Sequence, residues 1–160
     1  MRIRAVLCMA ACACYLTAHA QQRDFRVGDW IETKVGSSYQ GIHRSFEDLG
    51  NGLIRVNVSI NASGAAISSV ELRCDGRPYT VRDMSGKALE LTLSCQTLDA
   101  HTTAFTFLRS VSESWVKSAG TERVSEDGES MTVSAAQTDA QGRVVNRIER
   151  LFARSRRGRG

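Results

Sequence analysis

Few side chains in this sequence have the types and spacing that catalysis or metal binding requires. His43 and His101 are far apart and have no cysteine or carboxylate at ligand spacing, whereas zinc needs three or four convergent ligands. No serine stands in a Gly-x-Ser-x-Gly motif. The adjacent carboxylates Glu47-Asp48 and Glu126-Asp127 fall in expected turns, where solvation explains them better than acid–base catalysis. The sequence therefore predicts a non-catalytic protein without a metal site or a cofactor.

Cys74 and Cys95 are the cysteines that remain when the first twenty residues are set aside, because Cys8, Cys12 and Cys14 lie in that segment. Two thiols in an oxidising compartment usually pair. A disulfide here would close a loop of about twenty residues and stabilise the fold by roughly 3 kcal/mol. A free reactive thiol is the alternative, although no histidine stands at a recognisable spacing to activate either cysteine.

The N-terminus has the pattern of a secretory signal. A start with two arginines precedes an apolar run at residues 5–16, which is too short to span a bilayer. Small residues follow at positions 18 and 20, where a signal peptidase would cut. We expect residues 1–20 to be a cleaved signal peptide and the protein to be periplasmic or secreted. A lipoprotein is the alternative, because residues 9–12 resemble a lipidation box without its usual leucine. No other segment predicts a transmembrane span.

The excess of positive charge comes from the C-terminal tail. Without Arg2 and Arg4, 19 of the 21 Lys and Arg residues remain against 17 Asp and Glu. Four of these 19 lie in the last seven positions, namely Arg154, Arg156, Arg157 and Arg159. The remaining body is slightly acidic, so we expect no nucleic-acid partner. Residues 154–160 are expected to form a basic, disordered tail; contact of this tail with phosphate or an anionic membrane is the alternative.

Alternation of apolar and polar residues through the chain indicates β-strands. Residues 54–60 and 89–95 each place an apolar side chain at every second position. The C-terminal third predicts a three-stranded meander, with turns at residues 125–129 and 138–143, where an Asp shortly before a Gly favours a hairpin. About nine or ten short strands separated by frequent turns suggest a sandwich or a barrel. Because most links are tight hairpins, we favour an all-β, up-and-down antiparallel barrel of about eight to ten strands.

The two cysteines present a problem for a simple meander. By parity both lie on the apolar face, but a short strand around Tyr79 separates the strands that end in Cys74 and Cys95. Next-but-one strands lie roughly 10 Å apart, too far for a disulfide. A bridge therefore requires the middle strand to end early or to splay away.

The inward face of such a barrel is the candidate ligand site, since barrels of eight or more strands can hold one small molecule. The residues expected to line it are Val56, Val58, Leu72, Leu91, Leu93, Phe105, Phe107 and Met131. The alternative is that these side chains simply fill the core.

Gly28-Asp29-Trp30 opens the first expected strand with a Gly-x-Trp motif. Three later stretches of strand and turn follow at residues 75–81, 123–133 and 138–146. In this order and spacing, the four stretches resemble the small exported bacterial lipocalin-like barrels, a calycin-type group of mostly unassigned function. The Thr-Asp-Tyr motif of classical lipocalins is missing.

The resemblance implies a fold more than an activity. It implies a barrel over residues 28–153 in which Trp30 closes one end. In that group the tryptophan often stacks on an arginine of the last strand, which here would be Arg150 or Arg147 through a cation–π contact.

Three functions follow as hypotheses. The first is an exported barrel that binds a small apolar or amphipathic ligand in its lumen. The second is an envelope or secreted protein-binding module, such as a protease inhibitor, whose flexible lead-in at residues 21–27 could reach into a cleft. The third is a minor enzyme on a barrel scaffold, which two facing ionisable groups with shifted pKa values would favour. An internal void above roughly 300 Å³ would favour the first, whereas a filled lumen with an exposed apolar rim would favour the second.

Overall fold

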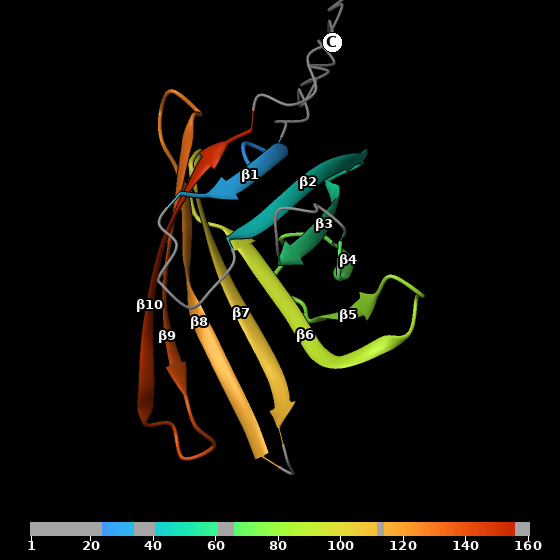
Figure 1. Cartoon of the computed structure of the whole chain (residues 1–160), viewed down its shortest axis with the longest axis vertical. Helices are drawn as coiled ribbons and strands as arrows, with labels where there is room; N and C mark the ends of the chain where they lie inside the picture. The colour runs from blue at the N-terminus through green and yellow to red at the C-terminus, as the bar shows by residue number, and fades with distance from the viewer. Residues whose placement is uncertain (1–23, 34–40, 61–65, 112–113, 156–160) are drawn as a thin grey trace, which may run out of the picture.

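Ten antiparallel strands form a closed barrel (Figure 1). The computed structural model describes residues 24–33, 41–60, 66–111 and 114–155. The strands are β1 (Gly28–Glu32), β2 (Ile42–Gly50), β3 (Leu53–Ile60), β4 (Ser68–Leu72), β5 (Tyr79–Asp83), β6 (Ala88–Thr97), β7 (Thr102–Val111), β8 (Ser114–Val124), β9 (Ser130–Thr138) and β10 (Val144–Arg154). No helix is present in these described ranges. The predicted all-β class is confirmed.

Each strand pairs with its neighbours in the sequence, and β1 pairs with β10 to close the sheet. In the closing ladder Trp30 stands opposite Arg154, and Glu32 stands opposite Phe152. The up-and-down order is therefore confirmed. A closed sheet has no free edge at which another chain could add a strand.

The exposed fraction of the inward-facing side chains falls from one end of the barrel to the other. Along β3, Ile60 is 45% exposed and Ile54 is 3% exposed. Along β6, Leu89 is exposed, Leu93 is buried and Cys95 is buried. We call the end with the β2–β3, β4–β5, β6–β7 and β8–β9 turns the closed end. The opposite end, where the β5–β6 and β9–β10 turns lie, is the open end.

Strand length also differs around the barrel. β1, β4 and β5 have five residues each, whereas β7 to β10 have nine to eleven. The long strands project past the short ones at the open end, toward the bottom of Figure 1. The open end is therefore uneven, with two projecting hairpins on one side of the mouth.

Cys74 and Cys95 form a disulfide, with their Cα atoms 4.5 Å apart. The bridge is possible because β4 and β5 pair only at Ser68 and Ser69, near the open end. Beyond that point the chain crosses to β6, where Gly76 N donates to the Cys95 carbonyl at 2.8 Å. The middle strand thus splays away, as the sequence requires of any bridge between these cysteines.

Two expected boundaries are wrong in their details. Residues 24–27 are not a flexible lead-in, because Arg26 is buried inside the closed end and Val27 N donates to Asp24 O at 3.1 Å. Arg154 is not part of a disordered tail, because it is the last residue of β10. The expected signal peptide at residues 1–20, residues 21–23 and residues 156–160 lie outside the described residues. Across the described ranges, no helix is long and apolar enough to span a membrane.

Candidate functional site

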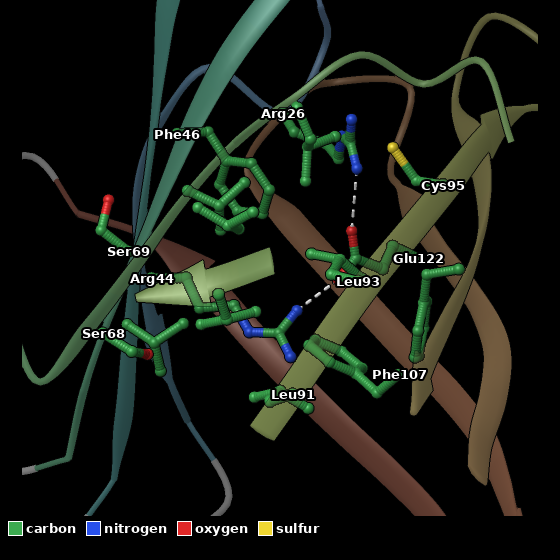
Figure 2. A pocket seen from close by; sticks show the side chains of 16 residues that line it. Arg26, Arg44, Phe46, Ser68, Ser69, Leu91, Leu93, Cys95, Phe107 and Glu122 are labelled. Atoms are coloured by element: carbon green, nitrogen blue, oxygen red, sulfur yellow. Dashed lines mark hydrogen bonds and ion pairs between the residues drawn. The ribbon is translucent and has the colours of Figure 1, made fainter. Parts of the chain in front are cut away.

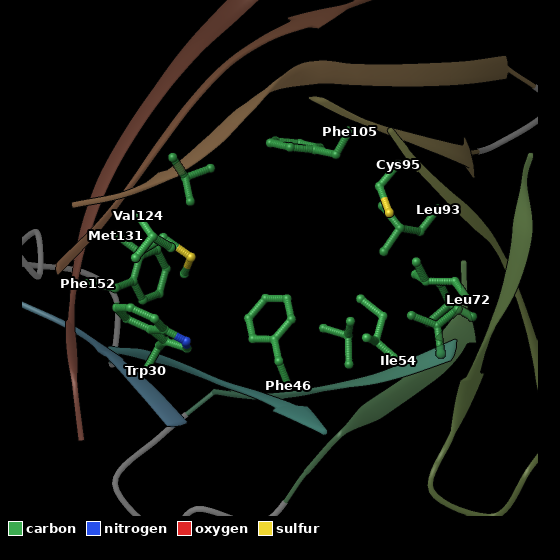
Figure 3. Close-up of a cluster of buried hydrophobic side chains, with 14 residues drawn as sticks. Trp30, Phe46, Ile54, Leu72, Leu93, Cys95, Phe105, Val124, Met131 and Phe152 are labelled. Atoms are coloured by element: carbon green, nitrogen blue, oxygen red, sulfur yellow. The ribbon is translucent and has the colours of Figure 1, made fainter. Parts of the chain in front are cut away.

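The lumen is lined largely by the residues that the alternation predicts. Seven of the eight predicted residues surround a central cavity: Val56, Val58, Leu72, Leu91, Leu93, Phe105 and Phe107. Met131 is fully buried, but it lies with Val124 and Phe152 near Trp30 rather than along the cavity wall (Figure 3). The apolar lumen is therefore a real feature of the fold, and Met131 belongs to the packing at the closed end.

This cavity is small. Its volume is about 50 Å³, whereas an engineered cavity that binds benzene has about 150 Å³ and sites for drug-sized ligands begin near roughly 300 Å³. It has room for a few water molecules or one small apolar group. Any larger ligand would enter whole only if the lining side chains moved.

Charged groups occupy part of the lumen (Figure 2). Arg26 Nη1 contacts Glu122 Oε2 at 3.2 Å, and Arg26 Nη2 contacts Asp24 Oδ2 at 2.7 Å. Arg44 donates from Nη1 to the other oxygen of Glu122. Two guanidinium groups and two carboxylates therefore balance one another, which buried charges require.

The pKa values of Arg26 and Asp24 follow from burial opposed by pairing. Burial of Arg26 works to lower its pKa, but the hydrogen bond and charge of Asp24 and the charge of Glu122 outweigh it and raise the pKa. Burial likewise works to raise the pKa of Asp24, and the hydrogen bond and charge of Arg26 bring it below its ordinary value. Both groups are therefore held in their charged forms.

Aromatic faces also hold the two arginines. The guanidinium carbon of Arg26 lies 5.2 Å from the centre of the Phe46 ring, and that of Arg44 lies 5.2 Å from the centre of the Phe152 ring. These are cation–π distances. Nε of Arg44 is buried and has no hydrogen-bond acceptor within the described part of the chain.

The sequence alone does not assign these charged residues to the lumen. Their positions do carry a signal, because Arg44 stands two residues before the buried Phe46 and Glu122 stands two residues before the buried Val124. Side chains two apart on a strand share a face. Arg44 and Glu122 therefore have inward parity, and the alternation of the apolar residues beside them is the signal that places them in the lumen.

Trp30 closes the barrel with a different arginine from those expected. The guanidinium carbon of Arg154 lies 4.3 Å from the Trp30 ring centre, and the indole donates to the Arg26 carbonyl at 2.7 Å. Arg150 instead pairs with Glu32 at 2.7 Å, and Arg147 is exposed. Naming Arg150 or Arg147 as the partner was therefore wrong, because Arg154 is still within the last strand.

Gly28 makes room for this arrangement. Its φ is +133°, and a Cβ atom there would lie 2.5 Å from Nη1 of Arg154. The same Nη1 donates to the Val27 carbonyl at 2.7 Å, and Nη2 donates to the Phe25 carbonyl at 3.2 Å. Glycine suits this position of the Gly-x-Trp motif because φ is +133°, a conformation that strains other residues, and because a Cβ atom would displace the guanidinium.

A wider hollow of about 630 Å³ lies outside the lumen at the closed end, where Asp48, Asp75 and Asp99 contribute to its lining. Each of these carboxylates accepts a backbone N–H two residues later, at 2.8 to 3.0 Å. They are turn-forming groups, as the sequence predicts for its loop carboxylates.

Within the described residues no three His, Cys, Asp or Glu side chains are placed to hold a metal ion. His101 lies 6.2 Å from Phe25, ring centre to ring centre.

The open end is the apolar surface of the molecule. Ten large hydrophobic side chains are exposed in the described ranges. Seven of the ten lie at the open end: Ile60, Ile67, Met84, Leu89, Trp115, Val144 and Val145. The other three are Leu49, Leu98 and Leu151. The structure therefore offers two candidate sites that adjoin each other, the small lumen and the apolar rim of its mouth.

No protein-family model matches this chain, and no curated protein matches it.

Proposed function

We propose that this chain is a non-catalytic binding protein of the periplasm or the extracellular space that contacts its partner through the open end of the barrel. The observation that carries the proposal is the gathering of exposed hydrophobic side chains at that end. Single exposed apolar residues are normal, but a group of them around one opening indicates an interaction surface. The closed end, in contrast, buries Trp30, Phe152 and Met131 completely.

The lumen volume supports the rim as the working surface. About 50 Å³ admits a small group and not a whole ligand of ordinary size. A partner at the open end would contact the rim and place at most one small apolar group between Leu91 and Phe107, which line the cavity.

A lipocalin-like barrel and an oxidising compartment both fit this proposal. The contact of Trp30 with an arginine of the last strand supports the resemblance to that group. The Cys74–Cys95 disulfide is compatible with export. Inhibition of a protease by an N-terminal segment receives less support, because residues 24–27 are held in the closed end and Arg26 is buried there.

Site-specific photocrosslinking tests the proposal with a matched pair of positions. Met84 at the open end is 58% exposed and Leu98 at the closed end is 56% exposed. A photoreactive amino acid at each position, in cells that export the protein, is expected to give a crosslinked product from position 84 and none from position 98. Products from position 98 alone, or equally from both positions, would refute the proposal.

A small amphipathic ligand in the lumen is the second candidate, and a specific observation favours it. Nε of Arg44 has no acceptor within the described part of the chain, and it belongs to a residue that lines the cavity beside Ser68. The acidic head of a small ligand would satisfy this donor while its apolar part contacts Val58 and Leu91. Native mass spectrometry of protein from its own host is expected to show one bound organic acid in this case, and the bare polypeptide mass otherwise.

A further inference from the structure

We propose that the partner of the open end is an anionic lipid surface, and that the projecting β7–β8 and β9–β10 hairpins make the contact. This inference rests on the proposed use of the open end and adds the class of partner. We call the contact region the tip, and define it by Arg109, Trp115, Lys117, Arg143, Val144, Val145 and Arg147.

Strand pairing brings the apolar residues of the tip together. Lys117 stands opposite Thr138 on β9, and Thr138 stands opposite Val144 on β10. These three residues form one row across adjacent strands, which lie about 4.8 Å apart. Trp115 stands two residues before Lys117 on β8, closer to the open end, and shares its face. Val145 lies at the irregularity between Val144 and Asn146. The tip thus presents one tryptophan and two valines, all exposed, on two adjoining hairpins.

Basic side chains lie on the same strands and turns as these apolar residues. The basic residues of the tip, Arg109, Lys117, Arg143 and Arg147, are all exposed. Asp139 accepts backbone N–H bonds and pairs with Arg143 at 2.7 Å, so these two charges cancel. The attraction to an anionic surface would therefore come from Arg109, Lys117 and Arg147, and the exposed Glu149 near Arg147 opposes part of it. Backbone and side-chain hydrogen bonds from Arg143 hold the pKa of Asp139 below its usual value.

The opposite end of the barrel carries charges of both signs. The turns at the closed end hold the carboxylates Asp24, Asp48, Asp75, Asp99, Glu126, Asp127 and Glu129, and the basic residues Arg73, Arg77, Arg123 and Arg154 lie at the same end. The exposed apolar residues of the tip, and not an overall charge asymmetry, therefore select the open end as the contact.

The position of the apolar residues on projecting hairpins favours a bilayer over a protein as the partner. Trp115, Val144 and Val145 lie at the tips of projecting hairpins, where a fluid interface can surround them (Figure 1). Tryptophan and basic residues together are typical of groups that sit at the lipid headgroups. A shallow hollow of about 240 Å³ on the outer sheet, which Ala119 and Ala136 help to line, is where a protein side chain would fit. None of the three apolar tip residues lines that hollow.

The chain supplies its own reporter for this contact. It has two tryptophans, of which Trp30 is 0% exposed and Trp115 is 50% exposed. On vesicles of phosphatidylcholine mixed equally with phosphatidylglycerol, tryptophan emission is expected to shift to the blue and to be quenched by brominated lipid. On phosphatidylcholine vesicles alone no change is expected, and added salt should reverse the binding.

Paired variants of the full chain identify the surface responsible. Lys117→Gln with Arg147→Gln is expected to lower vesicle binding roughly tenfold or more, given the usual contribution of each basic residue near an anionic surface. Val144→Ser with Val145→Ser should lower it as well, while Trp115 remains as the reporter. The control at the closed end, Arg77→Gln with Leu98→Ser, should bind as the wild type does. Unfolding curves of all variants should coincide, because every substituted side chain is exposed.

A third variant tests the other basic region, with Arg156, Arg157 and Arg159 changed to Gln. If this variant stops binding while the tip variants bind normally, the tip is not the contact and the inference is overturned. Absence of any binding to the anionic vesicles also overturns it. If vesicles do not bind but position 84 crosslinks to a protein, the lipid inference fails while the proposed use of the open end stands. Crosslinks from position 98 alone would overturn both.

Discussion

The two ends of the barrel are joined by the same ten strands, yet the closed end pairs its charged and aromatic groups internally and the open end exposes apolar side chains. At the closed end, Arg154 lies over Trp30 while Arg26 joins Asp24 and Glu122. At the open end, the exposed residues include Met84 and Trp115, and the strands end at unequal heights. The closed end satisfies its charges and aromatic rings internally. The open end leaves its apolar groups for something outside the chain.

This difference suggests a division of work along the barrel axis. Contacts that are buried and cross between distant segments resist local opening, whereas exposed termini of strands open at little cost. The closed end should therefore determine the stability of the fold, and the open end should determine binding. Substitutions at the two ends can separate these two properties.

The largest effect on stability is expected from Glu122→Gln. This change leaves Arg26 and Arg44 close together without their shared carboxylate, and an uncompensated buried charge typically costs about 3–5 kcal/mol. The free energy of unfolding, measured in urea, should fall by that amount. Glu90→Gln, an exposed strand position near the open end, is the control and should change it by less than about 0.5 kcal/mol. Equal effects of the two substitutions would contradict the division between the ends.

Removal of the disulfide should have the next largest effect. Cys74→Ala with Cys95→Ala opens a loop with a sequence separation of 21 residues, for which the chain-entropy model gives roughly 3 kcal/mol. It also removes the sulfur that Arg26 Nη2 contacts at 3.0 Å. Hydrogen exchange should accelerate around Gly76 and Arg26. Vesicle binding should stay unchanged under conditions in which the double variant is folded. A loss of binding in the folded double variant would show that the two ends are coupled.

Much of this fold could be predicted from local pattern, and the reasons are physical. The period-two runs at residues 54–60 and 89–95 determine which faces are buried, because each side chain on a strand alternates sides. Turn chemistry located the hairpins between β8, β9 and β10, where Gly128 and Gly142 have φ values of +72° and +78°. Consecutive hairpins then leave few topologies other than a barrel.

The candidate site was harder to predict than the fold. Whether Arg44 pairs with Glu122 depends on which strands face each other across the lumen, and no local pattern contains that distance. The choice among Arg147, Arg150 and Arg154 likewise depends on the β1–β10 register, in which Arg154 stands opposite Trp30. The volume of the lumen depends on side-chain packing across the whole barrel. Composition and alternation allow both a hollow barrel and a filled one.

The arginine that closes the barrel gives a third, smaller effect. Arg154→Gln removes the cation–π contact with Trp30 and weakens hydrogen bonds to the carbonyls of Val27 and Phe25. We expect a loss of about 2 kcal/mol in the free energy of unfolding, together with a red shift of Trp30 emission in a Trp115→Phe background. Arg150→Gln in the same background should leave that emission unchanged, because Arg150 pairs with Glu32. An emission shift with Arg150→Gln and none with Arg154→Gln would restore the partner predicted from the sequence.

Acid should act on the closed end through Asp24. The folded state holds the pKa of Asp24 below its ordinary value of 3.8, since its pairing with Arg26 outweighs the opposing effect of burial. A depressed carboxyl pKa contributes stability above the unfolded-state pKa, and this contribution is lost as the pH falls through the folded-state pKa. Asp24→Asn should therefore be less stable than the wild type at about pH 7, and the two should converge at a pH below the folded-state pKa. Urea unfolding at both pH values measures the difference. A gap that widens in acid would mean that Arg26 does not stabilise the carboxylate.

The smallest effect on stability is expected where the effect on function should be greatest. Met84→Ser and Ile67→Ser remove exposed side chains from the rim, so each should change the free energy of unfolding by no more than about 0.5 kcal/mol. A serine at either position keeps the backbone of the fold unchanged, and a group of exposed apolar side chains around one opening indicates an interaction surface. If these substitutions stabilise or leave the fold unchanged while they abolish crosslinking from a neighbouring rim position, the apolar rim is present for binding. If they destabilise the barrel as strongly as a closed-end substitution, the rim belongs to the core of the fold, and the contrast between the two ends would have to be abandoned.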